Sequence, residues 1–160
     1  MKVACIGYRD WALRIYDFLE ESTDHDFMII ASKREYCETK IREFDPDMIL
    51  FYGWSWIIDS KIIDDYECIM LHPSPLPKYR GGSPIQNQII NGEKESAVTL
   101  FLMDSGVDTG DIIAQESMSL DGHLNDVFER IYQLGCKLTF DILENGYTTI
   151  KQDDSRSTYY

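Results

Sequence analysis

Short apolar runs alternate with amphipathic segments along this chain. The runs are rich in Val, Ile and Phe and are bounded by turn residues, which predicts buried strands. These strands are expected at residues 2–7, 26–32, 47–53, 67–71, 97–103 and 111–120. Apolar residues three and four positions apart predict helices at residues 10–21, 39–44, 84–92 and 125–146. The alternation of strand and helix predicts an α/β fold with a mainly parallel sheet.

The ends of these segments carry local signals of their own. Pro84 suits the first turn of a helix, Asn125 is expected to cap the long C-terminal helix, and Gly146 is expected to end it. Residues 148–151 are expected to add an edge strand. Residues 152–160 are predicted to form a polar C-terminal tail, whose two terminal tyrosines could dock it.

Length and charge narrow the class of protein. With 160 residues and a net charge of −13, residues 1–151 are expected to form one soluble domain that needs no metal or disulfide. An acidic surface repels phosphate backbones, so no nucleic-acid partner is expected. The four cysteines are scattered without C-x-x-C spacing, which favours reduced thiols. No apolar stretch suits a signal sequence or a bilayer span, so we expect a cytoplasmic protein without a membrane partner.

The least regular stretch follows the fourth predicted strand. Residues 71–84 contain four of the five prolines and two adjacent glycines, which excludes a helix or a sheet ladder. A stiff loop at the carboxyl end of a strand is where open α/β sheets bind ligands. His72 at its start could shuttle a proton or stabilise charge. The loop alone leaves open whether His72 is catalytic or only bonds a loop carbonyl.

A second loop, residues 104–111, packs three carboxylates and two glycines into eight residues. It lacks the glycine and glutamate that complete an EF-hand loop, so no metal is expected there. If the two loops meet across neighbouring strand ends, an aspartate of this loop would orient His72 and raise its pKa. The paired His and Asp would then form the site.

Two further segments follow strand ends. The turn at Gly7 has one glycine where dinucleotide-binding folds have three, which argues against a nicotinamide or flavin oxidoreductase. That turn, with Arg9 beside it, could hold a phosphate or be an ordinary turn. Trp54 and Trp56 could pack in the core or form a wall for a flat heteroaromatic ligand.

These motifs occur together in one known family. The segment His72-Pro73-Ser74-x-Leu76-Pro77-Lys78-Tyr79-Arg80-Gly81 is followed by Asn91-Gly92-Glu93, Val98-Thr99 and Asp104-x-Gly106-x-Asp108-Thr109-Gly110. This series resembles the catalytic domain of the N10-formyltetrahydrofolate-dependent formyltransferases, which include methionyl-tRNA, glycinamide ribonucleotide and sugar N-formyltransferases. The resemblance is dense from about Trp54 to Gln115, with the two loops at the family's relative spacing. It implies a single Rossmann-like sheet with helices on both faces.

The resemblance also implies a reaction. A formyl group passes from N10-formyltetrahydrofolate to a primary amine, and the family's catalytic histidine and aspartate fall on His72 and Asp108. In the implied mechanism the His72 imidazolium stabilises the oxyanion, while Asp108 holds that charge and relays a proton.

Binding residues follow from the same resemblance. Folate-binding residues are expected to be Trp54, Ser55, Trp56, Ile57, Asp104 and Gly106, with backbone groups after Asp104 facing the pterin edge. The amine substrate is expected to contact Ser74, Lys78, Tyr79, Arg80 and Gly81. Lys78 and Arg80 could bind an anionic group or could be exposed loop charges.

One position departs from the family pattern of Asn-x-His. Met70 occupies the asparagine position and cannot donate a hydrogen bond to an oxyanion. Either Asn87, Gln86 or Ser74 supplies the donor, or the enzyme is slow, or the chain is a folate-binding module without catalysis. The intact histidine, aspartate and proline-glycine motif favour activity.

The acceptor is a further question. The tRNA enzymes of the family use a C-terminal β-barrel domain to hold tRNA, for which a chain ending near residue 160 leaves no room, and the acidic charge also disfavours tRNA. The segment 79–84 is more like the sugar and tRNA branches than the glycinamide ribonucleotide branch. An amino-sugar nucleotide is therefore the first expectation. Glycinamide ribonucleotide, another small amine and the formation of a homodimer stay open.

Overall fold

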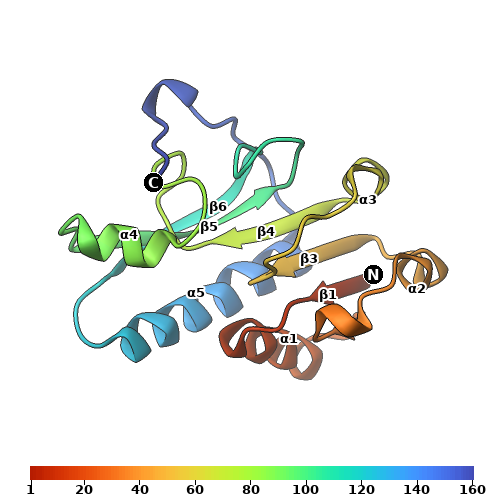
Figure 1. The fold of residues 1–160 in the computed structure, drawn as a ribbon. Helices are drawn as coiled ribbons and strands as arrows, with labels where there is room; N and C mark the ends of the chain where they lie inside the picture. The colour runs from red at the N-terminus through yellow and green to blue at the C-terminus, as the bar shows by residue number, and fades with distance from the viewer.

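A six-stranded sheet forms the centre of the molecule (Figure 1). The computed structural model describes residues 1–160. Its strands are β1 (Lys2–Ile6), β2 (Asp26–Ile30), β3 (Met48–Tyr52), β4 (Cys68–His72), β5 (Glu95–Leu102) and β6 (Ile112–Ser119), in the order β2-β1-β3-β4-β5-β6. The pairings β1–β2, β1–β3 and β3–β4 are parallel, whereas β5 runs antiparallel to β4 and β6. The predicted mainly parallel α/β sheet is confirmed.

Side chains that alternate along the central strands divide the core into two layers. In β1, Val3 and Cys5 face one side of the sheet, whereas Ala4 and Ile6 face the other. All five residues of β3 are buried, because both of its faces are covered. This burial explains why the central strands appear in the sequence as uninterrupted apolar runs.

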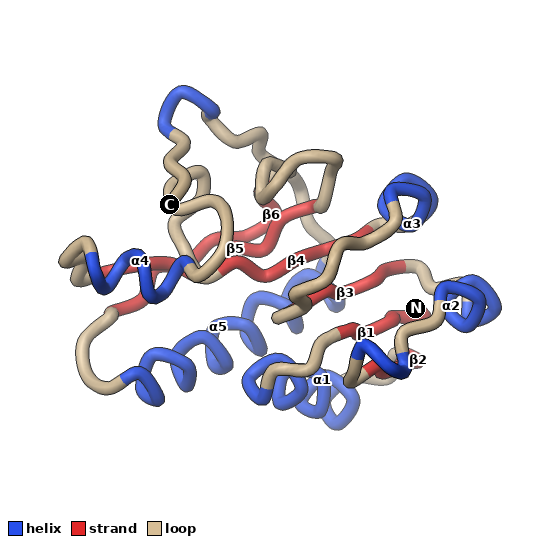
Figure 2. The backbone as a smooth tube through the Cα atoms, in the orientation of Figure 1, coloured by secondary structure: helices blue, strands red, loops and turns tan.

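Helices cover both faces of the sheet, as Figure 2 shows. One face carries α1 (Asp10–Ser22) and α5 (Leu124–Asn145), which lie side by side, and the other carries α2 (Glu38–Phe44) and α3 (Ser60–Asp65). The remaining helix, α4 (Pro84–Ile90), follows the loop after β4. The predicted arrangement of helices on both faces is confirmed. No helix in the structure has the length and apolar character that crossing a membrane requires.

The helix ends follow most of the local signals. Pro84 lies in the first turn of α4, and Gly146 ends α5 with a φ of 74°. The expected cap at Asn125 is wrong, because His123 caps α5 instead. The backbone N–H of His123 donates to the Asp126 carboxylate at 2.9 Å. This bond is one half of a capping box, and it places the cap two residues earlier than expected.

Three short elements were not predicted. They are α3 and two 3-10 helices, Lys33–Glu35 and Asp154–Arg156, and each is too short for its periodicity to be seen. The expected edge strand at residues 148–151 is reduced to a single antiparallel bridge between Ile150 and Ile112. Pairing stops there because the following chain turns inward and buries Gln152.

The direction of β5 determines how the loop that follows β4 meets the loop between β5 and β6. His72 at the end of β4 is level with Thr99, whereas Leu102 at the end of β5 is level with Ile69. The β5–β6 loop (residues 103–111) therefore leaves the sheet at the opposite end from the loop that follows β4. The expectation that both loops leave neighbouring strand ends is wrong. The β5–β6 loop reaches His72 by folding back over the sheet.

Candidate active site

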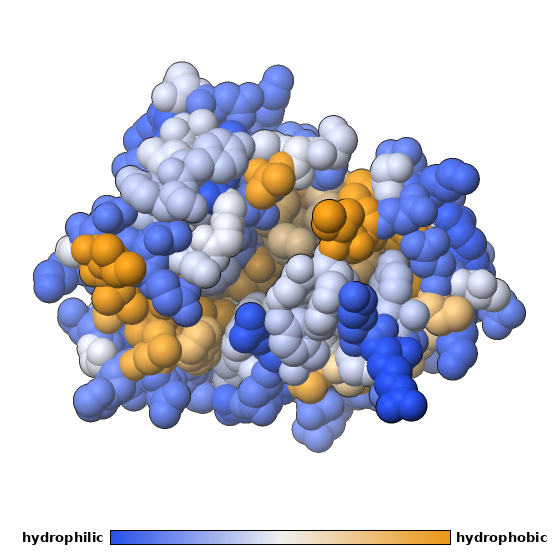
Figure 3. All heavy atoms as spheres, viewed as in Figure 1, coloured by the Kyte–Doolittle hydropathy of each residue, from blue (hydrophilic) through white to orange (hydrophobic).

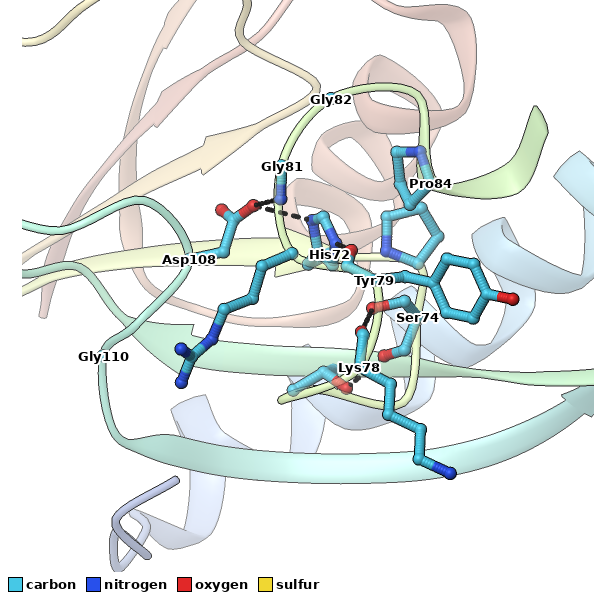
Figure 4. A network of polar contacts seen from close by, with 12 residues as sticks. His72, Ser74, Lys78, Tyr79, Gly81, Gly82, Pro84, Asp108 and Gly110 are labelled. Atoms are coloured by element: carbon cyan, nitrogen blue, oxygen red, sulfur yellow. Dashed lines mark hydrogen bonds and ion pairs between the residues drawn. The ribbon is translucent and has the colours of Figure 1, made fainter. Parts of the chain in front are cut away.

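The proline-glycine loop (residues 73–83) follows β4 and turns back toward it (Figure 4). The Ser74 hydroxyl donates to the Lys78 carbonyl at 2.7 Å, and the Ser74 carbonyl accepts from the Thr99 hydroxyl at 2.7 Å. Tyr79 has a φ of 59°, a left-handed conformation that is uncommon for bulky residues. This turn directs the Tyr79 carbonyl at the ring of His72.

His72 is buried, with a side chain 7% exposed. Its Nε2 lies 2.7 Å from the Tyr79 carbonyl oxygen. Because a carbonyl can only accept, Nε2 carries a proton. Its Nδ1 lies 3.6 Å from Asp108 Oδ2, which is longer than a direct hydrogen bond. Nδ1 is therefore the ring nitrogen left for chemistry.

Asp108 comes from the β5–β6 loop and has a φ of 58°. Its Oδ2 accepts a hydrogen bond from the Gly81 backbone N–H at 2.8 Å. The same oxygen faces His72, so Gly81 fixes the carboxylate against the ring (Figure 4). The prediction that His72 and Asp108 come within reach of each other is confirmed, although β5 brings Asp108 by an unexpected route.

Burial lowers the pKa of His72 below its ordinary value, while the Asp108 carboxylate and the Tyr79 carbonyl act in the opposite direction. The expected upward effect of Asp108 on the pKa of His72 is present, but desolvation of the ring outweighs it. Burial therefore favours the neutral ring, with a lone pair on Nδ1.

A cleft of about 980 Å³ opens beside this pair, on the face that is hollowed in Figure 3. Of the sequence-predicted site residues, the cleft is lined by Trp54, Ser55, His72, Gly81 and Asp108. Trp54 is 9% exposed and packs edge-on against Tyr8 and Trp56. The Ser55 hydroxyl shares a hydrogen bond of 2.6 Å with Tyr8. This bond ties together two loops that flank the cleft.

Four expected folate-binding residues lie outside the cleft lining. Trp56 is 37% exposed and Ile57 is fully exposed on the surface. Asp104 accepts hydrogen bonds from the Gly106 N–H and the Thr109 hydroxyl, so its carboxylate holds its own loop. Contact of folate with Trp56, Ile57, Asp104 and Gly106 therefore stays a prediction.

Only one of the residues expected to contact the amine substrate lines the cleft. Gly81 lines the cleft, but the Ser74 hydroxyl is occupied within its own turn. Lys78 and Tyr79 point away from Asp108 (Figure 4), and the Tyr79 hydroxyl donates to Glu93. Substrate contact by these side chains is not supported, because the turn that aims the Tyr79 carbonyl inward sends the side chains outward.

Arg80 also differs from expectation. Its side chain is only 4% exposed and bonds Gln152 at 3.0 and 3.2 Å and Asp154 at 2.7 Å. The guanidinium is thus occupied by protein groups outside the cleft, which does not support its assignment to an anionic substrate.

Several cleft residues were not assigned to the site from the sequence. A further part of the cleft wall comes from two helices, with Trp11 and Arg14 of α1 and Asn125, Phe128 and Glu129 of α5. No local motif marks them, because they belong to ordinary amphipathic helices. Arg9, considered above for a phosphate, also lines the cleft.

Met70 lies two residues before His72 on β4 and lines the cleft. Of the three candidate replacement donors, Gln86 alone shares this lining. The Asn87 amide donates to the Gly82 carbonyl at 3.2 Å, and the Ser74 hydroxyl is also occupied. The site therefore presents a thioether where the family has a donor, and Gln86 also lines the cleft.

A large cleft at the end of a central strand, with a buried His–Asp pair in its wall, defines an α/β protein with a small-molecule site. The family model described as formyl transferase matches residues 21–140. The chain therefore belongs to the formyl transferase family.

Individual relatives agree with this assignment. The chain is 38% identical over 151 residues to a methionyl-tRNA formyltransferase of Lachnospira eligens, covering 88% of this chain and 48% of the relative. It thus spans about half the length of that relative. The structure of methionyl-tRNA formyltransferase from Clostridium thermocellum aligns with a TM-score of 0.91 at 29% identity, covering 100% of this chain and 71% of the other.

A sugar enzyme is also similar. The formyltransferase PseJ from Anoxybacillus kamchatkensis, in complex with UDP-4,6-dideoxy-4-formamido-L-AltNAc and tetrahydrofolate, aligns with a TM-score of 0.79. It is 26% identical, and the alignment covers 100% of this chain and 85% of that one. Both branches of the family thus share the fold described here.

Proposed function

We propose that this protein transfers a formyl group from N10-formyltetrahydrofolate to a primary amine. The observation that carries the proposal is the buried pair of His72 and Asp108, 3.6 Å apart, in the wall of the cleft. Membership of the formyl transferase family supports the formyl group as the unit transferred. The tetrahydrofolate in the PseJ complex supports a folate donor.

The cleft fits such a donor and an amine together. Its volume of about 980 Å³ is at the upper end of the range for small-molecule sites, which is roughly 300–1,000 Å³. Trp54 offers an apolar wall near Met70, and Ser55 offers polar groups on the same loop. His72 and Asp108 line the same cleft.

The neutral His72 can act on both substrates. As the amine attacks the formyl carbon, Nδ1 accepts the proton that the amine nitrogen loses. The resulting imidazolium, held between Asp108 and the Tyr79 carbonyl, stabilises the negative charge on the formyl oxygen. When the bond from carbon to N10 breaks, the proton passes to N10. The products are a formamide and tetrahydrofolate.

For the acceptor we propose an amino-sugar nucleotide. The net charge of −13 repels a nucleic acid, whereas the cleft contains two cations, Arg9 and Arg14, that can bind a diphosphate. Arg14 is paired with Glu129 at 2.8 Å, and Arg9 has no ion pair in the structure. Arg9 is therefore the first candidate for this contact.

Methionyl-tRNA is the second candidate acceptor. The observation that favours it is the identity of 38% to the Lachnospira eligens enzyme, against 26% to PseJ. The two candidates differ in the salt dependence expected of their reactions. A reaction with tRNA weakens steeply with salt, because binding releases counterions from many phosphates.

The test is an assay of transfer from 10-formyltetrahydrofolate to three acceptors. These are a UDP- or dTDP-linked amino sugar, methionyl-tRNA and glycinamide ribonucleotide, with tetrahydrofolate followed by absorbance and the formamide by mass spectrometry. We expect turnover with the amino-sugar nucleotide and at least about tenfold less with the other acceptors. Titration with 5-formyltetrahydrofolate should quench tryptophan fluorescence, and Trp54→Phe should reduce the quenching more than Trp56→Phe.

Three results would contradict the proposal at different levels. Folate binding without transfer to any amine would favour a folate-binding module in place of an enzyme. No binding at millimolar folate would remove the folate site altogether. Turnover with methionyl-tRNA alone would leave the reaction standing and overturn the choice of acceptor.

Met70→Asn is expected to raise turnover. An asparagine two residues before His72 would add a donor for the formyl oxygen, and such donors contribute about 10²–10³ in rate in other enzymes. We expect kcat to rise at least about tenfold, with little change in folate affinity. Steady-state kinetics of both proteins with the same acceptor give the measurement.

Met103→Asn is the matched control. Met103 packs against the same apolar cluster as Met70 but does not line the cleft, so the same chemical change there should bring no gain. A loss of turnover in Met70→Asn would mean that Gln86 or a water already supplies the donor and that Met70 is needed for packing.

A further inference from the structure

Gln152 is a buried polar residue outside the cleft lining, with 4% of its surface exposed. Its amide nitrogen donates to the carbonyl oxygens of Asp108 at 2.9 Å and Gly110 at 2.7 Å. Its amide oxygen accepts two hydrogen bonds from Arg80, at 3.0 and 3.2 Å. One side chain thus joins the β5–β6 loop to the proline-glycine loop.

The end of the chain also holds the proline-glycine loop through its backbone. The Thr158 hydroxyl accepts from the Tyr79 N–H at 2.8 Å, and the Thr158 carbonyl accepts from the Arg80 N–H at 2.8 Å. The ring of Tyr160 stacks on that of Tyr79, with centroids 4.6 Å apart. Residues 152–160, predicted as a polar tail, lie along this loop with the C-terminus beside it (Figure 1).

These contacts fall on the two residues that hold His72. Tyr79 supplies the carbonyl for Nε2, and Asp108 supplies the carboxylate for Nδ1. Both have backbone in the left-handed region, at φ values of 59° and 58°. Non-glycine residues keep such conformations when surrounding contacts fix them. In this molecule Gln152 and Thr158 supply those contacts.

We propose that Gln152 is a positioning residue for the reaction, which holds Asp108 at the distance from His72 that the chemistry needs. Thr158 plays the corresponding part for Tyr79. This inference rests on the proposed function for its catalytic meaning, but the geometry that it asserts can be measured without any substrate.

The test uses Gln152→Ala in the full chain, with the pKa of His72 measured by NMR titration of its ring nitrogens. Gln152 holds the backbone carbonyl of Asp108, and without it the carboxylate is held only by the Gly81 N–H. The carboxylate should then move away from Nδ1, so the pKa of His72 should fall. Two groups that face the ring act on the pKa of His72. They are the charged side chain of Asp108 and the backbone carbonyl of Tyr79. In the transfer assay kcat should fall on the order of 10²-fold with a nearly unchanged KM for the donor.

Further variants separate positioning from loss of folding. Gln152→Glu keeps an acceptor for Arg80 but places an oxygen against both loop carbonyls, so kcat should fall as in Gln152→Ala. Thr158→Val removes the bond to the Tyr79 N–H and should alter the Nε2 resonance of His72. Asp153→Asn is the control, because Asp153 bonds only Ser155 and the turn that follows it.

A folded Gln152→Ala protein with an unchanged His72 titration would overturn the inference, whether or not the wild type transfers formyl groups. An altered His72 titration in Gln152→Ala, together with a wild type that transfers no formyl group, would support the geometry and would count against the proposed function alone.

Discussion

Replacement of His72 by alanine is expected to lower formyl transfer by at least about 10³-fold, because general acid–base catalysis and charge stabilisation are both lost. Nδ1 faces the Asp108 carboxylate in the cleft wall. Asp108→Asn should cost about 10²–10³-fold, since it keeps the shape but removes the charge that stabilises the imidazolium. Single-turnover rates of tetrahydrofolate formation measure both.

Binding distinguishes a catalytic loss from a folding defect. Both variants should still bind 5-formyltetrahydrofolate within about fivefold of the wild type, because neither change alters the loop at Trp54. His25→Ala is the matched control, since His25 pairs with Glu144 outside the cleft. Wild-type turnover in His72→Ala would refute the mechanism.

Gly110→Ala is expected to destabilise the fold by about 3 kcal/mol or more, the range of severe steric substitutions in a packed site. A Cβ at this position would overlap the carbonyl oxygen of Leu102, which is backbone and cannot move aside easily. The Gly110 carbonyl also accepts from Gln152. Urea unfolding followed by circular dichroism gives the change in the free energy of unfolding.

Gly82→Ala is the control for this experiment. Gly82 lies in the proline-glycine loop, and a Cβ there would meet no atom within 4 Å. We expect a change in unfolding free energy within about 0.5 kcal/mol. A Gly110→Ala protein as stable as Gly82→Ala would show that the β5–β6 loop does not approach Leu102 as described.

The local sequence was sufficient to predict the strands and helices that pack in the hydrophobic core. Strands such as β3 are buried on both faces, so every residue is apolar and the run is visible without any partner. The stripe along α5 and the glycine at its end are also local. The motif around His72 and the later Asp108 indicated the family, because a reaction demands particular residue types at fixed places.

The shortest helices and the direction of strand pairing could not be predicted from the local sequence. The helix α3 has six residues, too few for a helical period to be recognised. The antiparallel direction of β5 depends on which strand it pairs with, and an apolar run reads the same in either direction. This is why the sequence predicted that His72 and Asp108 meet while giving the wrong route for the β5–β6 loop.

The site as a whole was decided by tertiary structure. Arg80 was expected to face a substrate, but its partners Gln152 and Asp154 lie more than seventy residues away in the chain. Whether a buried cation faces a cleft or the protein depends on those distant partners. The wall formed by α1 and α5, and the bond from Gln152 to Asp108, likewise join segments that share no local pattern. Sequence periodicity reports how deeply a residue is buried, whereas only the folded chain determines which groups it meets there.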